Sequence, residues 1–276
     1  MKLFGGHITA TNESRLNVHY LSRFGFNFDN RSAHTKRTMM LRELSSLFEA
    51  VRTVDAPKAE YYRLIVSENC LGKQTLNNRN YTASYLEDLY GLDPSLIIFR
   101  ALRYYWERDR EGIPLLTILC TYSRDGLVRA STPYILGLPE GTHPHKSDLE
   151  SLILNLFPNR FGYKMIQSLV RNLLSTWTQS GHLSGKVRKV RSRATPTSGA
   201  VSYALLLGYL AGIRGENLFK SEYANLLDCS FERRLELAEE ASRRGWIILK
   251  RIGNVIEVLF PNLIRAREME WILEQN

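Results

Sequence analysis

The chain has 276 residues, of which 44% are apolar and 24% are charged, values typical of a globular protein with a substantial core. Its 37 Lys and Arg exceed its 28 Asp and Glu by nine, which favours polyanionic partners and argues against cationic ones. Three widely spaced cysteines, Cys70, Cys120 and Cys229, argue against a disulfide framework or a cysteine-based zinc site. They favour a reduced, cytoplasmic compartment.

The sequence predicts neither a signal peptide nor a membrane span. Residues 1–7 contain no apolar core of the kind that a secretory signal requires. The longest apolar run, residues 200–213, would rise only ~21 Å as a helix, whereas the hydrocarbon layer is ~30 Å thick. We therefore expect a buried helix here, within a soluble protein.

Residues 1–32 are rich in Asn, Gly, Ser and Thr and are predicted to form an irregular N-terminal arm with at most a short strand or helix. Its aromatic residues Tyr20, Phe24, Phe26 and Phe28 could stack on bases. Docking on the body of the protein is the favoured interpretation, because buried aromatic rings contribute large apolar areas.

Apolar residues at helical spacing predict a series of helices from residue 33 to residue 137. They are expected from Ala33 to near Asp55, after Pro57, from Thr75 to Tyr90, after an Asp93 cap, over residues 115–122 and over residues 125–136. Gly72-Lys73 resembles part of a phosphate-binding loop, but Ser67 and Gln74 occupy positions where that motif needs glycine and Ser or Thr. The pair is therefore interpreted as the end of a helix.

The strongest loop pattern is Gly137-Leu-Pro-Glu-Gly-Thr-His-Pro-His145, and we place a domain boundary there. It separates an N-terminal helical domain, residues 33–137, from a C-terminal helical domain, residues 146–276. His143 and His145 flank a proline in this loop, but neither a carboxylate nor a thiolate nearby completes a metal site. We expect no bound metal.

Residues 151–215 contain no Asp or Glu but hold nine of the basic residues, so they carry the whole net charge of the chain. An ordinary solvated surface mixes both signs, and the segregation favours binding to nucleic acid. A solvated basic face remains the plainer alternative. An acidic protein surface or an anionic membrane is the next candidate partner.

Within this basic stretch the spacing predicts a helix over residues 163–180, followed by Gly181 in a left-handed conformation. The basic run 186–193 follows, either as a ribbon beside the helix or as a disordered loop. Charge segregation makes seven residues candidates for phosphate contact: Lys164, Arg171, Lys186, Arg188, Lys189, Arg191 and Arg193.

The sequence pattern of residues 230–260 predicts a helix that ends at Gly245, followed by two strands around a turn at residues 251–254. This order resembles the second half of a winged helix-turn-helix. Its charges are balanced, so the element could bind DNA or serve only in packing. The fold class expected overall is mostly α, a two-domain helical protein with a small C-terminal helix plus β-hairpin.

The sequence lacks recognisable catalytic motifs, including a zinc-protease helix, a nucleophile elbow, a dinucleotide loop and a kinase signature. Clustered carboxylates of the kind that hold two metal ions are not evident either. We therefore expect a non-enzymatic protein without a cofactor.

A family resemblance rests on ordered short motifs: Leu64-Ile-Val-Ser-Glu-Asn-Cys-Leu-Gly-Lys73, Asp93-Pro-Ser-Leu96, Leu218-Phe-Lys-Ser221, Ser242-Arg-Arg-Gly245 and Phe260-Pro261. From Ala33 to Pro261 the chain resembles the A component of BREX bacteriophage-exclusion systems, the BrxA-like family. It differs in a longer arm before Ala33, a longer loop around residues 138–145, and Cys70 in place of an aliphatic residue. The resemblance implies a helical part similar to the NusB antitermination fold.

The resemblance further implies a cytoplasmic, non-enzymatic protein that binds double-stranded DNA. The leading hypothesis is a largely sequence-independent DNA-binding accessory of a bacterial phage-defence system, with other defence components as partners. The alternatives are an RNA-binding, antitermination-like protein and a scaffold whose basic face docks an acidic partner protein. The sequence does not decide the oligomeric state.

Overall fold

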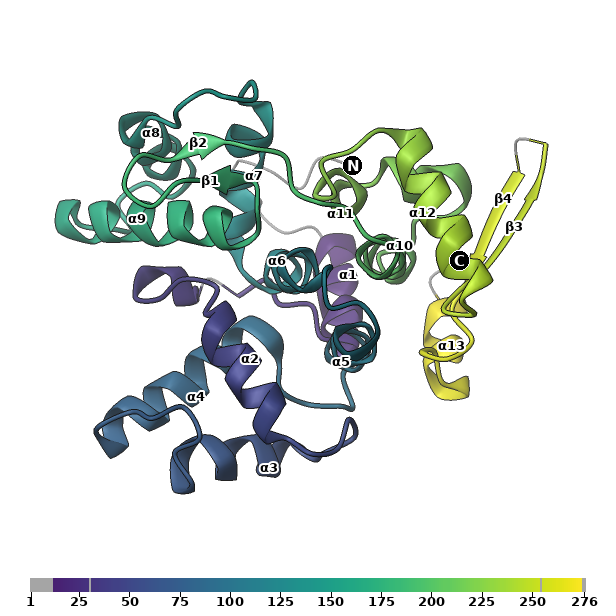
Figure 1. The fold of residues 1–276 in the computed structure, drawn as a ribbon, viewed down its shortest axis with the longest axis horizontal. Helices are drawn as coiled ribbons and strands as arrows, with labels where there is room; N and C mark the ends of the chain where they lie inside the picture. The colour runs from purple at the N-terminus through teal and green to yellow at the C-terminus, as the bar shows by residue number, and fades with distance from the viewer. Residues whose placement is uncertain (1–11, 30, 254, 275–276) are drawn as a thin grey trace.

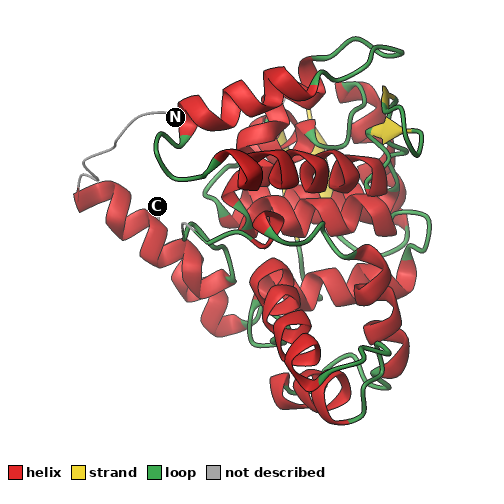
Figure 2. Ribbon diagram, turned by 90° about the vertical axis from the view of Figure 1, so that its left-hand side faces the viewer, coloured by secondary structure: helices red, strands yellow, loops and turns green. Residues whose placement is uncertain are grey.

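The computed structural model describes residues 12–29, 31–253 and 255–274, and these are mostly helical, as predicted (Figures 1 and 2). The first half contains α1 (Asn12–Phe24), η1 (Ala33–Thr35), α2 (Leu41–Ala50), α3 (Lys58–Tyr62), η2 (Arg63–Ser67), α4 (Leu76–Tyr90), α5 (Ile97–Arg108), α6 (Ile113–Arg124) and α7 (Gly126–Gly137). The second half contains α8 (Lys146–Leu156), α9 (Tyr163–Gln179), β1 (Leu183–Ser184), β2 (Val190–Arg191), α10 (Ser198–Leu210), η3 (Gly215–Lys220), α11 (Glu222–Asn225), α12 (Phe231–Arg243), β3 (Ile248–Ile252), β4 (Val255–Leu259) and α13 (Ala266–Leu273).

Helix α10 lies at the centre of the molecule, and every one of its residues is buried. It packs against α5, α6, α11 and α12, which surround it in Figure 1. A helix that is apolar on all sides needs such neighbours on all sides. The long apolar run is thus a buried helix, as expected. None of the described helices has the length and apolarity needed to cross a membrane.

The buried apolar residues form one continuous core that extends from Leu21 to Ile272. The loop between α7 and α8, where the sequence predicted a domain boundary, connects two helices that pack against each other. The core therefore contains residues from both sides of that loop. The division into two domains stays a prediction.

The helix predicted to begin at Ala33 begins only at Leu41, and this prediction was wrong. Residues 33–35 form a single 3-10 turn, and Met40 adopts a left-handed conformation with φ 53°. The segment before Leu41 is held out of helical geometry by side chains distant in sequence. The buried imidazole of His34 and the backbone N–H of Met39 both contact the Thr176 hydroxyl on α9, at 2.9 Å each.

The N-terminal arm is more helical than predicted, because α1 has 13 residues. Residues 1–11 of the predicted arm lie outside the described part of the chain. The aromatic residues dock on the body, as the favoured interpretation held: Phe24 and Phe26 are buried, and they contact the rings of Trp271 and Tyr223. Tyr20 and Phe28 pack partly against the same core.

Asp93 does not cap α5 as predicted. Its carboxylate accepts the N–H of Ser95, 2.8 Å away, within a turn, and α5 begins three residues later than expected from such a cap, after Leu96. A short-range hydrogen bond of this kind competes with helix capping. The helix itself is present and largely buried, as its composition predicted.

Two antiparallel hairpins are the sheets found in the described residues. The first, β1–β2, shows that the basic run forms an ordered ribbon at its base rather than a disordered loop. The second, β3–β4, follows α12 and Gly245 as predicted, but β3 begins at Ile248, which pairs with Leu259, and not at Trp246 as the sequence suggested. In Figure 1, β3–β4 extends away from the body, whereas β1–β2 lies over the part formed by α7, α8 and α9.

Candidate nucleic-acid interface

The stretch without acidic residues, 151–215, is distributed over α8, α9, the β1–β2 hairpin and α10 in the folded chain. Since α10 is buried, only the part before it contributes an extended surface. Arg214, just after α10, donates to the carbonyls of Tyr209 and Ile213 at 2.6 and 2.9 Å, and burial lowers its pKa. This arginine stabilises the end of a helix.

Helix α9 presents a charged face opposite its buried face. Ile166, Leu169, Val170, Leu173 and Trp177 are buried, as the helical spacing predicted. Lys164 and Arg171 are exposed. These two cations are seven positions apart on the helix, so their backbones lie about 10 Å apart along the axis, roughly three base steps of a duplex.

The β1–β2 hairpin carries basic residues at its exposed tip. Leu183 pairs with Arg191 and Ser184 pairs with Val190, which leaves residues 185–189 as the connecting loop. Lys186 and Arg188 are exposed there, on either side of Val187. Lys189 is half-buried, and its ammonium donates to the Gly185 carbonyl at 2.8 Å.

Arg191 belongs to the predicted phosphate-contact set, but the structure places its side chain inside the protein, only 5% exposed. Its guanidinium forms two bonds of 2.8 Å to the carboxylate of Asp228 and a third, of 3.2 Å, to the His182 carbonyl. Asp228 lies 37 residues away, beyond the acid-free stretch. Arg191 is therefore removed from the exposed set and instead anchors the hairpin.

Arg193 also forms an ion pair with an acidic residue that lies outside residues 151–215. Its Nε lies 3.0 Å from a carboxylate oxygen of Glu140, and both side chains are more than half exposed. Exposed pairs of this kind are worth only about 0–1 kcal/mol, so phosphate could replace Glu140 as the partner. Arg193 remains a weaker candidate than the cations on α9 and at the hairpin tip.

Four cations predicted from charge segregation, Lys164, Arg171, Lys186 and Arg188, form no ion pair with any residue that the structure describes. We call these four residues, together with Lys189, the basic surface. Sequence reasoning missed one neighbour of it, the exposed Lys36. This lysine follows the 3-10 turn whose His34 carbonyl accepts a 2.9 Å bond from Asn172 of α9.

A buried chain of polar groups ties this region to the rest of the protein. His34 Nδ1 lies 2.9 Å from a carboxylate oxygen of Asp125, and its Nε2 lies 2.9 Å from the Thr176 hydroxyl. Ser32 also donates to Asp125. Burial would raise the pKa of Asp125, but the adjacent His34 and these hydrogen bonds lower it overall.

The order Thr–His–Asp resembles a hydrolytic triad, yet its three side chains are buried and Thr176 Oγ1 already accepts the Met39 N–H. A nucleophile needs access to a substrate carbonyl. The chain of hydrogen bonds therefore acts as a structural clamp across α7, α9 and the segment before α2.

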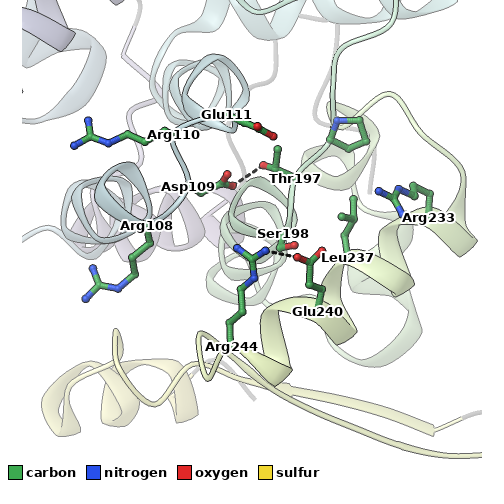
Figure 3. A pocket seen from close by; sticks show the side chains of 11 residues that line it. Arg108, Asp109, Arg110, Glu111, Thr197, Ser198, Arg233, Leu237, Glu240 and Arg244 are labelled. Carbon is green, nitrogen blue, oxygen red and sulfur yellow. Dashed lines mark hydrogen bonds and ion pairs between the residues drawn. The ribbon is translucent and has the colours of Figure 1, made fainter.

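A second concentration of arginines borders a hollow of about 470 Å³ beside the start of α10 (Figure 3). The N-terminus of α10 is already occupied, because Asp109 accepts from Thr197 Oγ1 at 2.5 Å and from the Gly199 N–H at 2.9 Å. Arg244 pairs with Glu240, one turn earlier on α12, at the edge of the hollow, and Arg108 lies over the Tyr104 ring, pointing away from Asp109. The hollow thus mixes both signs of charge and is a weaker anion site than the basic surface.

The chain matches no protein-family model, and the curated proteins include no significant match to it. In the described residues, no group of three or more His, Cys, Asp or Glu side chains is arranged to hold a metal ion. His143, one of the two loop histidines, instead makes a 2.7 Å hydrogen bond to the Lys189 carbonyl. It therefore helps to position the hairpin.

Proposed function

We propose that the protein binds double-stranded DNA through the backbone phosphates, using the basic surface of α9 and the β1–β2 hairpin tip. The observation that carries this proposal is the exposure of Lys164, Arg171, Lys186 and Arg188, none of them paired with an acid among the described residues. Cations in this state contact phosphates without first giving up an ion pair, and they release counterions from the duplex.

Backbone contacts position a protein on DNA, whereas base-edge hydrogen bonds specify sequence. The exposed set consists of Lys and Arg on one helix and one hairpin tip. Asn and Gln, the side chains that read adenine, are not among the proposed contacts. We therefore expect little base-edge readout of sequence, and the α9 cations should contribute equally to binding on every duplex.

RNA is the alternative partner of the same charges. Single-stranded RNA is bound largely by stacking on aromatic rings. The aromatic residues Phe24 and Phe26 are buried and cannot serve, but Tyr163 is 74% exposed beside Lys164. Competition with single-stranded RNA, repeated with Tyr163→Ala, separates the partners: displacement that this variant abolishes would favour RNA.

We further propose that the protein acts in a bacterial phage-exclusion system, on the basis of the resemblance of its ordered motifs to the BrxA-like family. This role can be tested independently of DNA binding. Removing the gene from its host should raise the plating efficiency of phage, and the four-cation variant described in the Discussion should fail to restore protection. Full protection by that variant would separate defence from DNA binding.

The first experiment measures binding to a random-sequence ~30-base-pair duplex by fluorescence anisotropy over a range of salt concentrations. Five phosphate contacts predict a log–log slope near −4.5, at about −0.9 per contact. The absence of binding at low salt would contradict the proposal. It would favour the scaffold alternative, in which the basic surface docks an acidic partner protein.

A further inference from the structure

The tip of the β1–β2 hairpin combines two cations with one strongly exposed apolar side chain. Val187 is 90% exposed, the largest exposed fraction among the large apolar side chains described. Lys186 and Arg188 lie on either side of it. An isolated exposed valine is ordinary on a protein surface. Here, however, it lies in a loop whose other side chains are all basic.

The loop conformation is defined by its own backbone. Gly185 has φ 89°, and a Cβ at this position would collide with the Arg188 carbonyl oxygen. The loop can therefore turn tightly only with glycine here. The Lys189 ammonium closes the loop by donating to the Gly185 carbonyl. The tip side chains are consequently directed outward from a short, closed loop.

The base of the hairpin is fixed to the body on two sides. On one side, the Arg191 N–H donates to the Thr142 carbonyl at 2.7 Å, and the Gly141 N–H donates to the Arg191 carbonyl at 2.9 Å. On the other side, the ring of His182, which directly precedes β1, makes a 2.9 Å hydrogen bond to the Leu226 carbonyl. The buried Arg191–Asp228 pair adds a further link. A tip held in this way loses little conformational freedom on binding, which favours affinity.

We propose that Lys186, Val187 and Arg188 enter the minor groove of duplex DNA and give the protein a preference for A·T-rich sequence. This inference rests on the proposed function and adds the groove and the class of sequence. Narrow A·T-rich minor grooves have an enhanced negative potential that attracts Arg and Lys. Apolar side chains beside such cations act as wedges against base steps in other minor-groove proteins.

The widths of the hairpin and of the minor groove indicate that only the tip of the hairpin can enter the groove. Paired strands lie about 4.8 Å apart, and with their side chains they are wider than the minor groove of about 6 Å. The paired part of this hairpin is only two residues long. The ribbon therefore stays outside while its tip side chains enter. The α9 cations then contact flanking phosphates.

The test compares three duplexes of equal length at one salt concentration: A·T-rich, G·C-rich, and the G·C-rich duplex with inosine in place of guanine. Inosine removes the amino group from the minor groove and leaves the major-groove face of the pair unchanged. We expect the A·T and inosine duplexes to bind at least about fivefold more tightly than the G·C duplex. Arg188→Ala should remove this preference, and Val187→Ser should reduce it.

Arg171→Ala is the matched control, since it removes one exposed cation from α9. It should weaken binding to all three duplexes by the same factor and leave the preference intact. An inosine duplex that binds like the G·C duplex would overturn the minor-groove inference. So would equal weakening of all three duplexes by Arg188→Ala, while the proposed function would stand in both cases. Failure of the wild-type protein to bind any of the duplexes would overturn the proposed function itself.

Discussion

Two parts of the chain have the same local design, and they differ in charge and in attachment. In each, a helix ends before a glycine with positive φ, and a two-stranded hairpin follows. We call residues 163–191 the α9 unit, with Gly181 at φ 86°, and residues 231–259 the α12 unit, with Gly245 at φ 72°.

The exposed face of α12 carries Glu232, Glu236 and Glu239 among its arginines, and Lys250 on its hairpin pairs with Glu257 at 3.0 Å. The α9 unit has no acids of its own, and four of its six cations, Lys164, Arg171, Lys186 and Arg188, are exposed. Its single buried arginine is paired with an acid of another segment, whereas the α12 hairpin extends from the body. The comparison shows that the same helix–hairpin arrangement can carry either mixed or purely basic exposed charge. The proposed DNA surface therefore rests on the pattern of exposed charge and not on the arrangement of helix and hairpin.

The largest effect is expected at the base of the α9 hairpin. Arg191→Ala leaves the buried carboxylate of Asp228 without its partner, and breaking a buried pair from one side typically costs about 3–5 kcal/mol. Lys250→Ala in the α12 unit removes an exposed pair and should cost at most about 1 kcal/mol. Urea unfolding of both variants measures the difference. Equal small losses would show that the α9 hairpin is not anchored by this pair.

Replacing Lys164, Arg171, Lys186 and Arg188 with Ala should weaken duplex binding at low salt at least about 100-fold, or about 3 kcal/mol. The log–log salt slope should fall by about 3 to 4, since four contacts are lost. The matched control replaces Arg233, Arg243, Lys250 and Arg251, which changes the net charge by the same amount in the α12 unit. If both variants lost the same affinity, overall charge rather than the basic surface would explain binding.

The two units should also differ in their response to acid. His182 follows Gly181, and burial lowers its pKa to about 4, although Asp228 opposes the shift. Trp246, at the corresponding place after Gly245, does not titrate. The unfolded chain takes up this proton near pH 6.5, before the folded protein does. The stability contribution of neutral His182 is therefore complete above pH 6.5 and declines toward pH 4.

Between pH 7 and pH 5 this loss should amount to about 2 kcal/mol. His182→Gln should flatten the dependence of the unfolding free energy on pH over that range, whereas Trp246→Phe should shift the whole curve without changing its slope. Urea titrations at several pH values measure both slopes. An unchanged slope in His182→Gln would show that other groups cause the acid sensitivity.

The smallest effect is expected from replacing the glycine with positive φ that the two units share. A Cβ at Gly181 would be 3.6 Å from Ala194, an ordinary contact, and one at Gly245 would meet open space. Only the positive φ opposes alanine, so Gly181→Ala and Gly245→Ala should each cost about 1 kcal/mol. A much larger loss for Gly181→Ala in thermal or urea unfolding would mean that the α9 hairpin shifts with its turn.

Much of the fold follows from interactions within a few residues, and the sequence predicted that part. The apolar spacing of Ile166, Leu169 and Leu173 defines the buried face of α9, because helix periodicity repeats every 3.6 residues. The left-handed glycines that end α9 and α12 follow from a similarly local rule. The same helical periodicity predicted that Lys164 and Arg171 are exposed. The start of α2 could not be predicted in this way, because contacts to the distant Thr176 determine it.

Charge segregation in the sequence located the candidate interface, but it could not decide which cations are exposed. Arg191 pairs with Asp228 across 37 residues, and Arg193 pairs with Glu140 across 53. The clamp of His34 with Asp125 and Thr176 spans still larger separations. Such pairs depend on how distant segments pack, and neither composition nor spacing encodes that packing. The local periodicity of the sequence thus places the charges on elements, while only the tertiary structure decides which of them remain exposed and unpaired.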